Sequence, residues 1–465
     1  MKQSVLSIAM LLGLWFNGHS QYIAEILEYA PAPGQLINTP SWGTLEAANS
    51  IIGGLSGHVT LGAWGGYVVF RFDNPVENHP NNPYGVDFTI FGNPLPDWSE
   101  PGIVWVMKDE NGNNLPDDTW YELAGSDYYF SNTVKNYEVT YTNPNQEVAC
   151  DVPWTDNLGQ NGFVYANRAH TQPYYPLASN FPQISTSFYT LRGTQINPEV
   201  DSTSPMTKIY KRAFGYADNV ARRSEPWSKP DNPYTHETEN SGGDAFDISW
   251  AVDADGNHIF LDQIHFVKVQ NGMLADGGRL GEVSTEICGA IKVAPNPTVT
   301  GQQQMIAIKD LPPTLTTQEL QLEALAFNLG IPQTNETILW STPTEGASID
   351  NNGLLHVSSS GVLTVTATLA SNPKIIATTS TTINLVGITE LTNYRLEIYP
   401  NPASEYISLS ETSGELSIFN IEGQRVKLIH LNGNLIPISD LPMGLYIVKL
   451  RLEHTICTAK LFIKD

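Results

Sequence analysis

The sequence predicts an all-β protein in which a large jelly roll or β-sandwich is followed by two smaller β-sandwiches. The best-patterned segments are short runs in which apolar and polar residues alternate, as in residues 66–72, 86–91 and 264–269. Glycine (37 residues) and proline (31 residues) separate such runs throughout the chain. The 20 tyrosines and 10 tryptophans, set against 24 lysines and arginines, favour β-rich surfaces over charged helices.

Residues 1–20 are predicted to be a secretory signal peptide. Lys2 is followed by an apolar run over residues 5–16 and by small and polar residues before Gln21. This order of segments is typical of export signals, and a buried N-terminal helix is the weaker alternative. No other stretch approaches the roughly 20 apolar residues that a membrane helix needs. We therefore expect an exported chain with no transmembrane segment after maturation.

The charge and the cysteine content limit the partners. A formal net charge of −24 argues against nucleic acid and anionic membranes, and leaves cations among the ligands that the chain could bind. None of the three cysteines, Cys150, Cys288 and Cys457, has the spacing of a metal site. Cys457 belongs to a C-terminal module, so removal of that module would leave Cys150 and Cys288. The sequence leaves open whether these two pair in an oxidising compartment.

Residues 21–290 are predicted to form the ligand-binding domain. Four segments follow one another there: GGYVVFRFDNPV at 65–76, DFTIFGN at 87–93, SEPGIVWV at 99–106 and GGDAFDI at 242–248. Their order resembles that of a jelly-roll family of exported bacterial cell-surface proteins found alongside outer-membrane uptake machinery, some of them associated with capture of vitamin B12. The resemblance implies one large sandwich that captures a bulky nutrient, and it suggests an outer-membrane transporter as a further partner.

Aromatic residues in the loops of this domain are candidate ligand contacts. Each lies beside Pro, Asp, Asn or Gly and outside a cleanly alternating strand. Flat aromatic faces bordered by amides would suit a sugar or a large planar cofactor, whereas ordinary packing is the alternative for each ring. The predicted ligand is a corrinoid or a glycan, and composition does not choose between them. The predicted ligand-binding residues are Trp98, Trp154, Tyr174, Tyr175 and Trp227.

A polar loop in the same domain is a candidate calcium site. It carries oxygen-bearing side chains at alternate positions and then a carboxylate pair, which could surround a hard cation at roughly 2.3–2.6 Å. It departs from the EF-hand pattern, because Asn114 replaces the turn glycine and Trp120 stands in the position of the bidentate glutamate. The alternative is a hairpin loop rich in turn-forming residues. The predicted calcium ligands are Asp109, Asn111, Asn113, Asp117 and Asp118.

Residues 301–386 are predicted to form a second sandwich. Short strand-like runs occur there, for example at 338–341 and 362–367. Trp340, followed by the turn IDNNGL at 349–354, resembles bacterial immunoglobulin-like surface domains. The segment lacks clustered aromatic residues, so we expect a spacer and not a binding module.

Residues 390–465 are predicted to form the small C-terminal sandwich. YPNP at 399–402 opens it, GLYIVK at 444–449 is a central strand, and a lysine-bearing strand at 460–464 closes it. This order resembles the type IX secretion sorting domain. The resemblance implies an address that the secretion machinery reads and that is commonly cut off, and a protein that is secreted or attached to the outer-membrane surface.

No motif in the sequence indicates catalysis. Residues 236–239 (HETE) lack the second histidine of a zinc-protease helix, Gly-x-Ser-x-Gly is absent, and no cysteine has a nucleophile context. We therefore expect a non-catalytic, surface-displayed or secreted protein that binds a bulky nutrient. A carbohydrate-active enzyme or its accessory module is one alternative, since the separation of carboxylates is a property of the fold. A structural or adhesive surface protein is the other.

Overall fold

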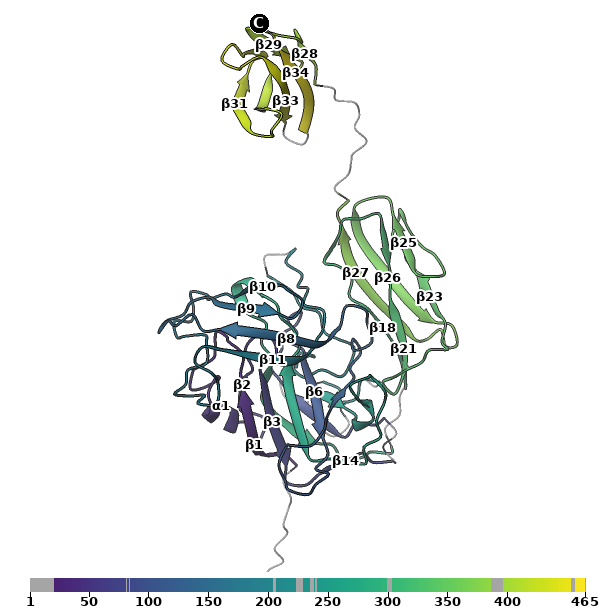
Figure 1. Cartoon of the computed structure of the whole chain (residues 1–465). Helices are drawn as coiled ribbons and strands as arrows, with labels where there is room; N and C mark the ends of the chain where they lie inside the picture. Colours follow the sequence, from purple (N-terminus) through teal and green to yellow (C-terminus); the bar gives the residue numbers. More distant parts are fainter. Residues whose placement is uncertain are drawn as a thin grey trace, which may run out of the picture. The chain divides into compact units, whose positions relative to one another are not determined.

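A computed structural model describes most of the chain, whose contacts group it into two compact units, Met1–Leu385 and Val386–Asp465 (Figure 1). The predicted signal peptide at 1–20 lies outside the described residues. Within the described residues, no helix is long and apolar enough to cross a membrane. The structure describes residues 21–80, 82, 84–203, 206–222, 229–234, 238, 241–298, 303–385, 396–452 and 456–464.

The prediction of an all-β protein is confirmed. Strands make up almost all of the regular structure in the described residues, and the α-helix α1 (Leu45–Asn49) has five residues. Thr44 caps this helix by accepting a hydrogen bond from the Ala47 N–H at 3.3 Å. The 3-10 turns η2 (Ile248–Trp250) and η3 (Gly278–Leu280) have three residues each.

A six-stranded antiparallel sheet forms the middle of the first unit, in the order β1-β3-β15-β6-β7-β13. Side chains of a strand alternate between two faces, and Val68, Phe70, Val104 and Val106 are buried on one of them. The strands are β1 (Ile23–Ala30), β3 (Tyr67–Phe72), β6 (Gly102–Met107), β7 (Trp120–Leu123), β13 (Ala251–Val252) and β15 (Phe266–Asn271).

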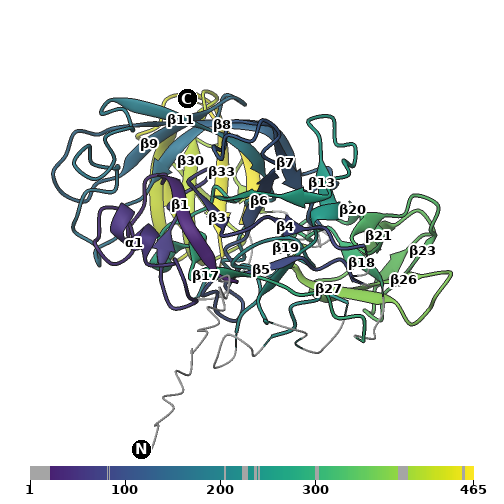
Figure 2. The same ribbon diagram turned by 90° about the horizontal axis from the view of Figure 1, so that it is seen from below.

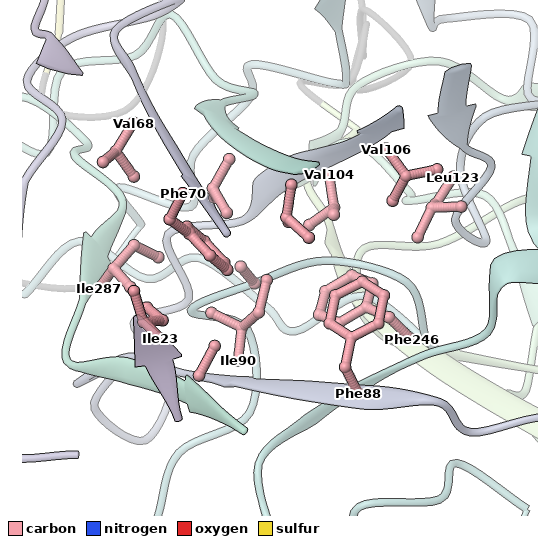
Figure 3. Close-up of a cluster of buried hydrophobic side chains, with 14 of the residues drawn as sticks. Ile23, Val68, Phe70, Phe88, Ile90, Val104, Val106, Leu123, Phe246 and Ile287 are labelled. Atoms are coloured by element: carbon pink, nitrogen blue, oxygen red, sulfur yellow. The ribbon is translucent and has the colours of Figure 1, made fainter. Parts of the chain in front are cut away.

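A three-stranded sheet, β12-β5-β17, packs against that buried face. Phe88 and Phe246 stack with ring centroids 5.3 Å apart and, with Ile90, lie opposite Val104 and Val106 (Figure 3). Burial of each such side chain stabilises the fold by roughly 1.5–3 kcal/mol. Two short strand pairs, β2 with β16 and β4 with β14, complete this part. The strands are β5 (Phe88–Phe91), β12 (Asp244–Phe246), β17 (Gly289–Lys292), β2 (Val59–Thr60), β16 (Glu286–Ile287), β4 (Val76–Glu77) and β14 (Gln263–Ile264).

A four-stranded sheet, β10-β9-β8-β11, covers the other face of the six-stranded sheet. Trp64 and Tyr137 meet edge to face with centroids 4.7 Å apart, and Gln270 of β15 donates to the Arg192 carbonyl of β11 at 3.0 Å. Figure 2 shows the three layers, with β8, β9 and β11 on one side of β1, β3 and β6, and β5 and β17 on the other. The strands are β8 (Val134–Thr142), β9 (Val152–Asp156), β10 (Asn161–Val164) and β11 (Phe188–Gln195).

The remainder of the first unit is a second sandwich, built from the sheets β18-β21-β22, β19-β27-β26-β23 and β20-β25-β24. Leu315, Leu355, Leu363 and Val365 are buried in its core. The strands are β18 (Gln304–Ile308), β19 (Thr314–Leu315), β20 (Glu319–Gln321), β21 (Ala324–Asn328), β22 (Ile331–Pro332), β23 (Ile338–Ser341), β24 (Ala347–Ile349), β25 (Leu354–Val357), β26 (Gly361–Leu369) and β27 (Ile376–Ile383).

The two sandwiches of the first unit share part of one core. The rings of Phe214 and Phe327 lie 5.1 Å apart, and Trp250 Nε1 donates to the Leu329 carbonyl at 3.1 Å. A fragment that ended near residue 290 would therefore expose Phe214 and Trp250 to water. The segment predicted to bind the ligand is best studied together with the second sandwich.

The second unit is a small sandwich with a core of its own, in sheets β28-β29-β32 and β31-β30-β33-β34. Tyr446, Val448 and Leu450, at every second position of β33, are buried in this core. The strands are β28 (Ile398–Tyr399), β29 (Tyr406–Leu409), β30 (Ser413–Phe419), β31 (Arg425–Asn432), β32 (Leu435–Pro437), β33 (Gly444–Arg451) and β34 (Ile456–Ile463).

The three cysteines are free thiols in this structure, so Cys150 and Cys288 do not form the disulfide that the sequence left open. Cys288 is buried beside Phe91 and Ile291. Burial raises the pKa of its thiol to about 11, which makes it a weak nucleophile at neutral pH.

Candidate ligand-binding site

The candidate site begins with a row of side chains on the face of the six-stranded sheet that points toward the four-stranded sheet. Lys268 of β15 pairs with Trp105 of β6, and Trp105 pairs with Glu122 of β7. Paired residues of neighbouring strands project to the same face, so an ammonium, an indole and a carboxylate stand side by side. Trp120 precedes Glu122 by two residues in β7 and faces the same way.

The four-stranded sheet closes this row into a cavity of about 280 Å³, which we call the interlayer pocket. Strand β8 contributes Lys135 and Glu138 to its lining, β11 contributes Arg192 and Thr194, and Tyr128 lines it as well. Ligand clefts in proteins range from roughly 300 to 1,000 Å³, so the interlayer pocket has the size of a small site.

Aromatic rings surround the ammonium group of Lys268. Its Nζ lies 4.7 Å from the ring centroid of Trp105, 5.2 Å from that of Trp120 and 5.8 Å from that of Tyr67. Desolvation lowers the pKa of Lys268 to about 8, and nearby carboxylates, first among them Glu122, oppose the shift. The rings attract the cation through their electron-rich faces but provide no hydrogen-bond acceptor of ordinary strength.

Two further cations line the interlayer pocket. Lys135 Nζ lies 3.5 Å from the ring centroid of Tyr128, and desolvation lowers the pKa of Lys135. Arg192 Nε pairs with Glu138 Oε1 at 2.9 Å, and 74% of the Arg192 side chain is exposed. Exposed ion pairs of this kind contribute roughly 0–1 kcal/mol, so a ligand can compete with this one.

Glu122 is the buried carboxyl group of the pocket. Only 5% of the residue is exposed, and its Oε2 accepts a hydrogen bond from the Thr194 hydroxyl at 2.5 Å. Desolvation raises the pKa of Glu122 to about 7, against the opposing effects of Thr194, Lys135 and Lys268. The carboxyl group is therefore close to half-protonated at neutral pH.

The indole N–H of Trp105 is buried and has no hydrogen-bond partner within the part of the chain that the structure describes. An unpaired buried donor costs roughly 1–3 kcal/mol, and native proteins leave few of them.

Three predicted ligand contacts serve as packing residues in the structure. Trp98 is 7% exposed and lies in a cluster with Ile103 and Met273. Tyr174 and Tyr175 are 1% and 3% exposed and lie in the cluster beneath the four-stranded sheet. Rings buried this deeply leave little face for a ligand, which is the alternative that the sequence allowed.

The other two predicted contacts have different outcomes. Trp154 lies in β9, half-buried against the same cluster as Tyr174 and Tyr175. Trp227 lies outside the described residues. The structure thus brings together Trp154, Tyr174 and Tyr175, and places Trp98 in a separate cluster.

Sequence reasoning missed the residues of the interlayer pocket because they lie inside strands. Lys268 stands between Val267 and Val269, which are both buried in the core on the opposite face. Trp105 likewise stands between Val104 and Val106. A charged or aromatic residue at the outward position of an otherwise buried strand is the signal that could have found them.

The predicted calcium ligands share one exposed loop, where hydrogen bonds already occupy Asp109. Its Oδ1 accepts from the Gly112 N–H at 2.7 Å and its Oδ2 from the Asn114 N–H at 2.9 Å. Desolvation raises the pKa of Asp109, but the loop N–H donors outweigh it and hold the pKa below its ordinary value. The arrangement stabilises an anionic Asp109 without a cation.

The amides of the loop bond its other two acids. Asn113 Nδ2 donates to Asp117 Oδ2 at 3.0 Å, and Asn111 Nδ2 donates to Asp117 Oδ1 at 3.1 Å. Asp118 Oδ2 accepts from the Glu110 N–H at 3.0 Å. These bonds are those of a polar hairpin loop, and a cation would have to displace the amide donors.

Calcium binding by this loop stays a prediction. If calcium binds there, chelator lowers the melting temperature of the mature chain, because the carboxylates repel each other without the cation. Replacing Asp109 and Asp117 with Ala should then remove the response, whereas Asp255→Ala, in a separate exposed turn, should keep it. A melting temperature that chelator leaves unchanged would leave the loop with its hydrogen-bonded hairpin alone.

A second acidic group lies deep in the first unit. Among the described residues, Glu100, Asp218 and Glu286 have carboxylate oxygens that all lie within 4.8 Å of one another, and all three are buried. Desolvation and then the charge of Glu286 raise the pKa of Glu100 and Asp218 well above the ordinary value, and desolvation raises that of Glu286 to about 7. Carboxylates this close share protons, and they are residues that could hold a cation.

The second unit matches a known family. Residues 397–464 fit the model of the secretion system C-terminal sorting domain. This unit is a sorting domain. The match indicates export through the type IX secretion system, with release or attachment at the cell surface, and makes the secretion machinery a partner of the chain.

Solved structures resemble parts of the chain at low identity, and no curated protein sequence matches it. Immunoglobulin domains 1–5 of Sidekick-1 are 10% identical over 34% of this chain and 39% of that chain, with a TM-score of 0.16. The Escherichia coli adhesin FdeC is 12% identical over 46% of this chain and 90% of that chain, with a TM-score of 0.21. The surface-layer protein SbsC is 10% identical over 86% of this chain and 53% of that chain, with a TM-score of 0.19.

Proposed function

We propose that the mature chain is a non-catalytic, exported binding protein that captures a glycan in the interlayer pocket. The observation that carries the proposal is the cavity itself, where the Trp105 and Trp120 rings lie beside Lys268 and Glu122. Indole faces pack against sugar rings, and surrounding donors and acceptors bond to the hydroxyls. The sorting domain supports a place for this binding at the cell surface or in the medium.

The size of the pocket favours a glycan over a corrinoid. A cavity of about 280 Å³ suits a sugar ring at the end or the branch of an oligosaccharide. A corrin ring with its amide side chains is far larger than this cavity. We therefore propose a glycan as the first candidate ligand of the interlayer pocket and a corrinoid as the second.

Calorimetric titration of residues 21–465 with a panel of oligosaccharides and with cyanocobalamin tests the proposal. We expect a glycan to bind, and Trp120→Ala to weaken its binding about 5- to 30-fold, since a stacked aromatic ring contributes on the order of 1–2 kcal/mol. Phe260→Ala, which removes a ring that is 83% exposed outside the pocket, is the matched control and should leave binding unchanged.

Two results would contradict the proposal. Binding of cyanocobalamin with no glycan bound would reverse the order of the two ligands. Release of reducing sugar during the titration would show a carbohydrate-active enzyme in place of a pure binder.

A further inference from the structure

We infer that the glycan of the interlayer pocket is acidic, and that its carboxylate or sulfate group binds between Lys268 and Lys135. The inference rests on the proposed function and names the ligand class of the same pocket. It follows from the charges that line the cavity and from the donors there that have no acceptor.

The first observation is a concentration of cations in an acidic protein. The chain has 24 lysines and arginines against 48 acidic residues. Three of those cations, Lys135, Arg192 and Lys268, line this one cavity of about 280 Å³. Three acids, Glu122, Glu138 and Asp253, line the same cavity, so positive and negative side chains are equal in number there, whereas acids outnumber cations twofold in the whole chain. This local contrast favours an anionic ligand over the rest of the protein's own surface.

The second observation is that the acids of the cavity are committed to other partners. Glu138 pairs with Arg192 at 2.9 Å. Asp253 accepts from the N–H groups of Asp255 and Asn257, both at 2.9 Å, within its own turn. Glu122 accepts the Thr194 hydroxyl. None of these acids forms an ion pair with Lys135 or Lys268 among the described residues.

The third observation concerns the two lysines themselves. Lys268 and Lys135 contact aromatic rings, and within the described part of the chain neither donates a hydrogen bond to an oxygen. Each ammonium group carries three N–H donors, and aromatic faces do not replace the oxygen acceptors that water would supply. A negatively charged oxygen group offers both the acceptors and the opposite charge.

The indole of Trp105 lies against Lys268, and its buried N–H is closed to the cavity. Trp105 Nε1 is buried and unpartnered in the described part, and the Trp105 ring is the one that Lys268 Nζ approaches at 4.7 Å. A neutral sugar would add no negative charge to that of Glu122, which opposes the lowering of the pKa of both lysines. The two ammonium groups would repel a cationic ligand. An acidic sugar provides both lysines with oxygen acceptors and an opposite charge.

Matched acidic and neutral ligands test the inference on residues 21–465. The probes are galacturonate and glucuronate oligosaccharides and their methyl esters, which keep the sugar and remove the charge. We expect the free acid to bind at least about tenfold more tightly than its ester, because a hydrogen bond to a charged group contributes about 1.5–3 kcal/mol. Added salt should reduce this preference.

Lysine variants show which residues cause the preference for the free acid over its ester. Lys268→Gln should abolish the preference for the acid, and Lys135→Gln, at the more exposed of the two positions, should reduce it even if Lys268→Gln fails to fold. Lys374→Gln, an exposed lysine of the second sandwich, is the matched control and should retain the full preference.

Three outcomes would overturn the inference that the glycan is acidic. Equal affinity for acid and ester, with binding still dependent on Trp120, would overturn the inference and leave the proposed glycan binding intact. Binding of neutral oligosaccharides alone would do the same. Failure of every saccharide to bind would overturn the inference and the proposed function together.

Discussion

Deleting residues 386–465 is expected to abolish display at the cell surface and release into the medium, while the first unit folds and accumulates in the periplasm. The sorting domain has a core of its own, and the contacts of the chain divide at Leu385. Its loss should therefore remove the address without unfolding the rest. Surface labelling and fractionation of cells that express the full and the shortened chain measure the effect.

A point variant separates loss of the address from loss of chain length. Val448→Asp places a charge in the buried core of the sorting domain and should unfold it, because an unpaired buried charge costs several kcal/mol. Ile421→Asp alters a residue that is 75% exposed and should sort normally. Normal surface display of the shortened chain would show that another segment carries the address.

The first unit is expected to lose stability as the pH rises from about 5 to 8. Desolvation raises the pKa of Glu282 to about 8, against ordinary glutamate values near 4.3, and that of Glu122 to about 7. Between the unfolded and the folded pKa the native state binds more protons than the unfolded state, so the free energy of unfolding falls as the pH rises. Denaturant titrations across this range, with chelator present, give the slope.

Glu282→Gln tests the sign of this effect at one residue. Glu282 Oε1 accepts from the Gln35 N–H at 2.8 Å, a bond that the amide oxygen of glutamine can replace. The variant should gain about 4–5 kcal/mol over the native protein at pH 8 and about 1 kcal/mol at pH 5, since one pKa unit corresponds to about 1.4 kcal/mol. Glu147→Gln, an exposed control, should leave the slope unchanged. A free energy of unfolding that rises with pH would contradict the account.

The elements that the sequence predicted best are those whose pattern is local. The run 264–269 contains the start of β15 at Phe266–Asn271, and 66–72 contains β3 at Tyr67–Phe72. In both strands one face is buried in the large core, so apolar and polar residues alternate along the sequence. The sorting domain could be predicted for the same reason, since its strands and turns are close together along the chain.

The site could not be predicted, because it depends on strand order and not on local pattern. Lys268, Trp105 and Glu122 meet because β15, β6 and β7 are neighbours in one sheet, and a single sequence does not reveal that order. Tyr174 and Tyr175 fail as exposed contacts for a related reason. Their loop folds beneath the four-stranded sheet, and a residue's position beside a proline says nothing about what covers it.

A crystal structure of residues 21–465 with the tightest-binding acidic oligosaccharide shows directly whether the interlayer pocket binds an acidic glycan. We predict a sugar ring in the interlayer pocket against Trp120, with its carboxylate or sulfate within hydrogen-bond distance of Lys268 Nζ. Oligosaccharide bound elsewhere on the first unit, with the interlayer pocket holding water alone, would contradict it.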